Sequence, residues 1–77
     1  MNSNILLIDD KESIIASIAG VLRFDGYNVF DANNGKVGLN ILMKEALDLV
    51  VVDYQMPEMN GMEFIKAAKL IKPEIPI

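Results

Sequence analysis

Residues 5–10 read Ile-Leu-Leu-Ile-Asp-Asp, four branched apolar side chains followed by two carboxylates. Residues 49–52 read Leu-Val-Val-Val and are followed by Asp53. Short apolar runs rich in branched side chains are typical of strands that are buried on both faces of a parallel sheet. The carboxyl ends of neighbouring parallel strands meet at one edge, where open α/β sheets bind ligands. We therefore expect Asp9, Asp10 and Asp53 to converge at that edge.

The remaining segments alternate between helical and extended patterns. Residues 11–24 carry a helical stripe of apolar side chains, namely Ile14, Ile15, Ile18, Val21 and Leu22. Apolar spacing predicts two more helices over residues 36–46 and 62–71, and a short strand over residues 27–32. Residues 75–77 resemble the beginning of a fourth strand. The order of elements predicts a doubly wound α/β fold with a parallel sheet and right-handed connections.

Two glycines lie at predicted helix ends. Gly26 follows the first helix, where a left-handed glycine commonly ends a helix. Gly61 precedes the third helix, and we expect it to supply a backbone angle that the chain needs there. An asparagine of the pair Asn33-Asn34 is available to cap the second helix.

Composition excludes several classes of protein. The 77 residues carry a net charge of −4, and the seven basic residues are scattered, which argues against direct nucleic-acid binding. Cysteine and histidine are both absent, so disulfides, thiolate metal sites and a histidine base are excluded. No apolar run approaches the ~20 residues of a membrane span, and the N-terminus lacks a secretion signal pattern. We expect a cytoplasmic protein without a membrane segment.

Three converging carboxylates need a compensating partner. At a separation of about 5 Å and an effective dielectric near 20, each like-charged pair costs about 3 kcal/mol. Protonation of one carboxyl group is one answer, and a divalent cation is the other. We favour Mg2+, because an all-oxygen site with one or two carboxylates suits it. Asp53, alone at its strand end, would then act as a nucleophile towards phosphorus while Asp9 and Asp10 hold the metal.

Residues 53–61 read Asp-Tyr-Gln-Met-Pro-Glu-Met-Asn-Gly. Together with residues 5–10, this motif resembles the receiver domain of bacterial two-component response regulators. The resemblance runs over essentially the whole chain. It implies a flavodoxin-like sheet with strand order 2-1-3-4-5 and a role in phosphorelay signalling.

The resemblance also implies roles for individual residues. Asp53 would be phosphorylated by a sensor histidine kinase or a phosphotransfer protein. Mg2+ would be held by Asp10, Asp53 and the backbone carbonyl of Gln55, and Asp9 would act through water.

The family carries two further site residues beyond the point where this chain ends. They are a Ser or Thr after the fourth strand and a Lys after the fifth, and Ile77 precedes both. We therefore expect residues 1–77 to be the N-terminal part of a single receiver domain, truncated at the start of the fourth strand and impaired in phosphorylation. The stripe on the first helix and the sheet edge would be left bare, so we expect a homo-oligomer formed through either surface.

Other functions remain open at this point. The chain could be a self-associating interaction fragment that is not phosphorylated. A phosphohydrolase is less favoured, because residues 53–55 read Asp-Tyr-Gln and lack a second Asp that could act as acid and base. Dinucleotide binding is disfavoured by the absence of G-x-G-x-x-G after the first strand. We predict a signalling module rather than an enzyme.

Overall fold

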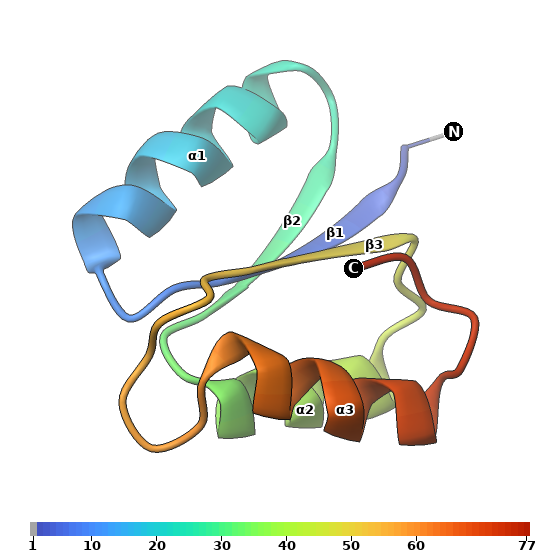
Figure 1. The fold of residues 1–77 in the computed structure, drawn as a ribbon. Helices are drawn as coiled ribbons and strands as arrows, with labels where there is room; N and C mark the ends of the chain where they lie inside the picture. The colour runs from blue at the N-terminus through green and yellow to red at the C-terminus, as the bar shows by residue number, and fades with distance from the viewer. Residues whose placement is uncertain (1) are drawn as a thin grey trace.

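A computed structural model describes residues 2–77 (Figure 1). Strands and helices alternate along the chain, and the three predicted helices and the three complete predicted strands are present with small shifts at their ends. The elements are β1 (Asn4–Ile8), α1 (Glu12–Phe24), β2 (Asn28–Ala32), α2 (Gly35–Lys44), β3 (Leu49–Val52) and α3 (Gly61–Ile71). This order confirms the predicted α/β class.

The three strands form a parallel sheet in the order β2-β1-β3. Ile8, the last residue of β1, lies opposite Ala32 on one side and Val52 on the other, so the strands end together. The backbone N–H of Asp53 donates to the Ile8 carbonyl at 2.9 Å, which continues the ladder past the end of β3. The order agrees with the first three strands of the predicted 2-1-3-4-5 sheet.

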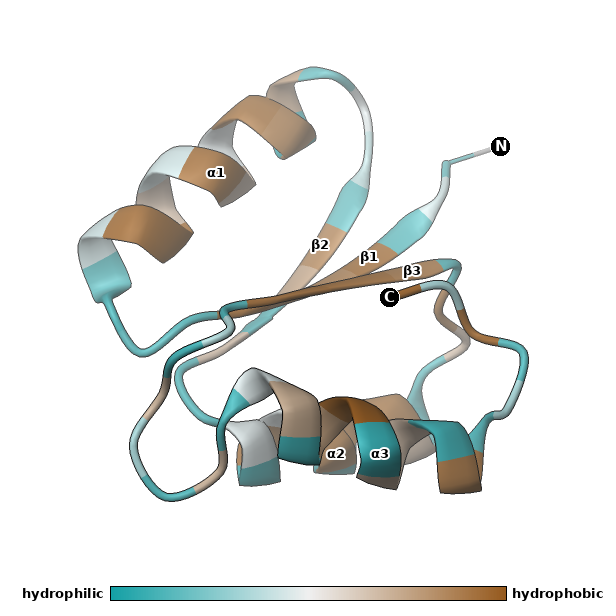
Figure 2. Cartoon of the chain, viewed as in Figure 1, coloured by the Kyte–Doolittle hydropathy of each residue, from teal (hydrophilic) through white to brown (hydrophobic). Residues whose placement is uncertain are grey.

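The larger core lies between the sheet and the layer formed by α2 and α3, which cover the same face (Figure 1). Leu6, Ile8, Val50, Leu42 and Phe64 are fully buried there. Figure 2 shows β1 and β3 as largely hydrophobic, with hydrophilic residues where each strand gives way to a loop. The first apolar run therefore forms the central strand β1, and the second forms the neighbouring strand β3.

The opposite face of the sheet is covered only in part. There α1 packs over β1 and β2, and the buried contacts are made by Leu7, Ile15 and Ala19. Leu49 and Val51 of β3 share this face but are 36% and 38% exposed. The expectation that both apolar runs are buried on both faces is right for β1 and wrong for β3, because α1 lies over the other two strands.

Most of the apolar stripe predicted on the first helix points away from the core. Ile15 is the one buried member, while Ile14, Ile18 and Val21 are exposed and Leu22 is half-buried. The expectation of a bare apolar surface on this helix is confirmed for the three exposed residues. Self-association through it stays a prediction.

Local side-chain contacts set the helix ends. The Asn34 side chain accepts a hydrogen bond from the Val37 N–H, as the predicted cap of the second helix requires. At the start of α3, Asn60 and Glu63 form a reciprocal capping box. Gly26 has φ of 96°, the left-handed conformation predicted for it. None of the helices within residues 2–77 is long and apolar enough to cross a membrane.

The last residues lie beside β3 without forming a strand. Ile75 is buried, and the Pro76 carbonyl accepts a hydrogen bond from the Val50 N–H at 2.9 Å. Pro76 has no N–H to return to the ladder. The predicted beginning of a fourth strand is therefore right in position, but residues 75–77 are not extended strand in the structure.

Candidate functional site

The three predicted acids meet at the carboxyl edge of the sheet. Asp9 and Asp10 follow β1, and Asp53 follows the adjacent strand β3. One carboxylate oxygen from each lies within 4.8 Å of the other two. The convergence that the sequence predicts is thus confirmed, and its cause is the common end point of two parallel strands.

Backbone N–H groups orient two of these carboxylates. Asp9 Oδ1 accepts a hydrogen bond from the Lys11 N–H at 2.9 Å. Asp53 Oδ1 accepts one from the Gln55 N–H at 3.4 Å. Asp53 remains accessible, because its side chain is 25% exposed. The contact between Gln55 and Asp53 in the structure is therefore made by the backbone N–H of Gln55. Coordination of Mg2+ by the backbone carbonyl of Gln55 stays a prediction.

Lys11 is a residue of the site that the sequence did not identify. Its ammonium Nζ lies 3.3 Å from Asp10 Oδ1 and 3.7 Å from Asp53 Oδ2. Lys11 is the N-cap residue of α1, directly after the acid pair. Its place next to Asp10 in the sequence was the available signal, but its contact with Asp53 depends on the pairing of β1 with β3.

The acids alter the titration of this lysine. The hydrogen bond to Asp10, together with the negative charges of Asp10 and Asp53, raises the pKa of the Lys11 ammonium above its ordinary value of 10.5. Any stability contributed by the protonated form is fully present below that ordinary value and is lost as the pH rises through the raised pKa. The ion pairs of Lys11 therefore persist throughout the neutral range.

The donor set fits a hard divalent cation. Mg2+ takes oxygen ligands at about 2.0–2.1 Å in an octahedron, so its ligand oxygens lie roughly 3–4 Å apart. The spacing of up to 4.8 Å between the three carboxylates is close to this range, and small side-chain rotations would close the difference. With no histidine or cysteine in the chain, softer transition-metal sites are not favoured.

The loop after Asp53 packs tightly against the end of β3. Met56 is buried, and Glu58 adopts a left-handed conformation with φ of 67°. The Gly61 N–H donates to the Tyr54 carbonyl at 3.0 Å, and a Cβ added to Gly61 would lie 2.7 Å from the Asp53 carbonyl oxygen. Gly61 does not have a positive φ. The prediction that a glycine is needed here for its backbone angle is therefore wrong. A glycine is needed here because two backbone segments approach closely.

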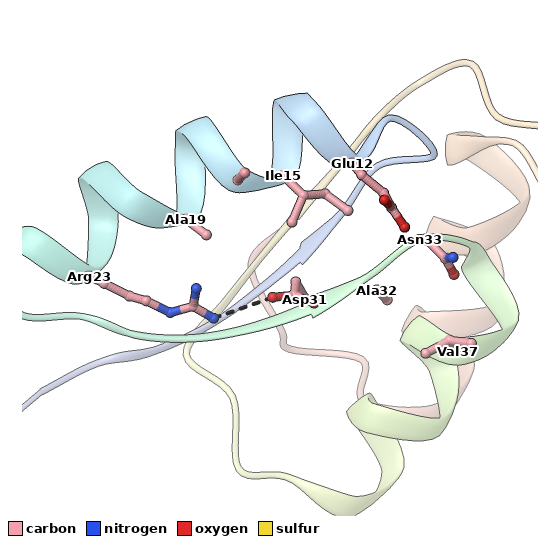
Figure 3. Close-up of a pocket in the computed structure, with 9 residues that line it drawn as sticks. Glu12, Ile15, Ala19, Arg23, Asp31, Ala32, Asn33 and Val37 are labelled. Atoms are coloured by element: carbon pink, nitrogen blue, oxygen red, sulfur yellow. Dashed lines mark hydrogen bonds and ion pairs between the residues drawn. The ribbon is translucent and has the colours of Figure 1, made fainter.

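A pocket of about 440 Å³ lies between α1 and the end of β2 (Figure 3). The guanidinium of Arg23 and the carboxylate of Asp31, which are 3.3 Å apart, line it together with Ala19 (Figure 3). None of the three converging acids lines this pocket. The acid cluster therefore lies outside this pocket, at the carboxyl edge of the sheet.

The fold and the acid cluster together define a class of protein. Residues 5–77 match the model of the response regulator receiver domain, and the chain belongs to this family. Receiver domains are phosphoacceptor modules of two-component signalling systems.

Individual relatives support this assignment. The chain is 40% identical over 75 residues to sporulation initiation phosphotransferase F of Bacillus subtilis, covering 97% of this chain and 60% of the relative. A receiver domain protein from Clostridium thermocellum superposes with a TM-score of 0.91 at 33% identity, covering 95% of this chain and 60% of the other. A crystal structure of the histidine kinase ThkA in complex with the response regulator protein TrrA contains a chain that superposes with a TM-score of 0.88 at 29% identity, covering 95% of this chain and 63% of the other. The chain therefore spans about 60% of the length of these relatives.

Proposed function

We propose that this chain is the phosphoacceptor part of a two-component signalling system, with Asp53 as the phosphorylated residue. The observation that carries the proposal is the meeting of three carboxylates at the sheet edge of a receiver-domain fold. Asp9, Asp10, Asp53 and the Gln55 carbonyl are the proposed holders of Mg2+. The proposed donor is a sensor histidine kinase or a phosphotransfer protein, which can reach Asp53 because its side chain is 25% exposed.

The chemistry follows from the placement of these residues. A carboxylate oxygen of Asp53 attacks the phosphorus of a phosphohistidine, forming an acyl phosphate as the bond from phosphorus to the donor nitrogen breaks. When bound, Mg2+ neutralises charge on the phosphoryl oxygens. The Gln55 N–H holds one Asp53 oxygen in place at 3.4 Å. Asp9 and Asp10 supply the negative charge that attracts the cation to the site.

Further parts of the proposal concern the protein as a whole. Residues 1–77 are proposed to belong to one receiver domain, which signals from the cytoplasm and acts as a phosphoacceptor rather than as an enzyme.

Incubation with acetyl phosphate and Mg2+ tests the phosphoacceptor function. Intact mass is expected to rise by one phosphoryl group for the natural chain and to stay unchanged for Asp53→Asn. Asp25→Asn is the matched control, since Asp25 lies at the other end of α1, away from the cluster. Omission of Mg2+, or its removal with a chelator, is expected to abolish the modification.

Two outcomes would contradict the assignment of Asp53. One is a folded natural chain that gains no mass with acetyl phosphate or with a phosphorylated histidine kinase. The other is a gain that persists in Asp53→Asn. The first would favour the alternative function, an interaction fragment that is not phosphorylated.

We also propose that the chain self-associates, through the first helix or through the exposed edge of the sheet. The supporting observation is the exposure of Ile14, Ile18 and Val21 on α1 and of Leu49 and Val51 on β3. Ile18→Lys is expected to shift the mass in solution from dimer or larger to monomer at micromolar concentration, measured by light scattering. Leu70→Lys in α3, on the opposite layer, is the control and should leave the mass unchanged. A monomeric natural chain would rule out this proposal.

A further inference from the structure

We propose that Lys11 is a built-in competitor of the divalent cation, whose ammonium group occupies the space between Asp10 and Asp53 and so raises the Mg2+ concentration that the site requires. This inference rests on the proposed function of the acid cluster. It adds a means by which this chain sets the threshold for phosphorylation.

The contacts of Lys11 carry the argument. Its Nζ reaches Asp10 Oδ1 at 3.3 Å and Asp53 Oδ2 at 3.7 Å, and its backbone N–H donates to Asp9 Oδ1 at 2.9 Å. One residue therefore contacts all three acids. Among the ion pairs formed within residues 2–77, those of Lys11 alone involve the cluster.

The backbone of Lys11 is held in place while its side chain remains free to move. The Lys11 carbonyl accepts hydrogen bonds from the N–H groups of Ile14 and Ile15, both at 3.1 Å, which fixes the residue at the start of α1. The side chain is 61% exposed. Its ammonium can therefore leave the acids for solvent without disturbing the core, as reversible competition requires.

Electrostatics gives the size of the effect. If the Lys11 ammonium stays about 6 Å from a bound Mg2+ in a water-like dielectric, the repulsion between the two charges weakens Mg2+ binding about tenfold. Movement of the lysine towards solvent and screening by salt reduce this factor. We expect Lys11 to weaken Mg2+ binding roughly three- to tenfold at low ionic strength.

Calorimetric titration with Mg2+ alone tests the inference on the natural chain and three variants. Lys11→Met keeps the length of the side chain and removes its charge, so its Kd for Mg2+ is expected to fall three- to tenfold. Lys11→Arg retains the charge and should stay within about twofold of the natural chain. Lys44→Met removes the same charge at the last residue of α2, at the opposite edge of the sheet, and should also change little.

The phosphorylation reaction supplies a second readout. The Mg2+ concentration that gives half-maximal modification by acetyl phosphate should fall for Lys11→Met by the same factor as the Kd. An unchanged or raised Kd in this variant, with circular dichroism showing a folded chain, would overturn the competitor role while leaving the proposed function intact. If neither the natural chain nor Lys11→Met binds Mg2+, both the competitor role of Lys11 and the proposed function of the acid cluster are overturned.

Discussion

Phe64→Ala is expected to remove a large part of the stability of this chain. Phe64 projects from α3 into the larger core and is fully buried. Truncation of a buried phenylalanine to alanine typically costs about 3–5 kcal/mol, because apolar contacts are lost and a cavity remains. A domain of this size has roughly 4–12 kcal/mol in total, so the variant should lose at least about a quarter of its stability and unfold at a clearly lower urea concentration.

Urea denaturation followed by far-ultraviolet circular dichroism measures this effect. Phe64→Leu is the graded control, because it keeps most of the apolar volume and should lose about 1–2 kcal/mol. The ring of Phe64 is tightly packed, since a Cβ added to Gly38 would lie 3.1 Å from Phe64 Cε1. This packing supports the large loss of stability expected for Phe64→Ala. A loss below about 1 kcal/mol for Phe64→Ala would show that α3 does not depend on this core.

Gly61→Ala is expected to damage stability and the acid site together. The added Cβ would lie 2.7 Å from the Asp53 carbonyl oxygen and 2.8 Å from Tyr54 Cα, closer than non-bonded atoms normally approach. Both neighbours are backbone, and the Asp53 N–H is bonded to the Ile8 carbonyl, so neither segment can yield easily. We expect a loss of about 2–3 kcal/mol, as for other overpacked positions.

The displaced loop should also be visible in function. Because the clash falls on the backbone of Asp53, Mg2+ binding and modification by acetyl phosphate should weaken in the fraction of Gly61→Ala that stays folded. Gly20→Ala is the matched control: an added Cβ at Gly20 meets no atom within 4 Å, and alanine should stabilise α1 by about 0.5–1 kcal/mol. Equal stability of the two alanine variants would refute the close-approach explanation.

The local pattern of residues was sufficient to predict the order of elements and the position of the acids. Apolar runs at residues 5–8 and 49–52 indicate strands, because short runs of branched apolar side chains are typical of buried strands. Once the two strands pair in parallel, Asp9, Asp10 and Asp53 must share an edge. The first inference depends on short-range spacing alone, whereas the second also needs the two strands to be parallel neighbours, which the alternation of strands and helices predicts.

Tertiary packing decided what spacing along the chain cannot show. The contact of Lys11 with Asp53 joins residues from two strand ends, and the requirement for glycine at position 61 comes from the backbone of residues 53–54. The exposure of Leu49 and Val51 likewise depends on where α1 lies across the sheet. Each of these features is set by distances between segments far apart in the sequence, and only the folded chain determines those distances.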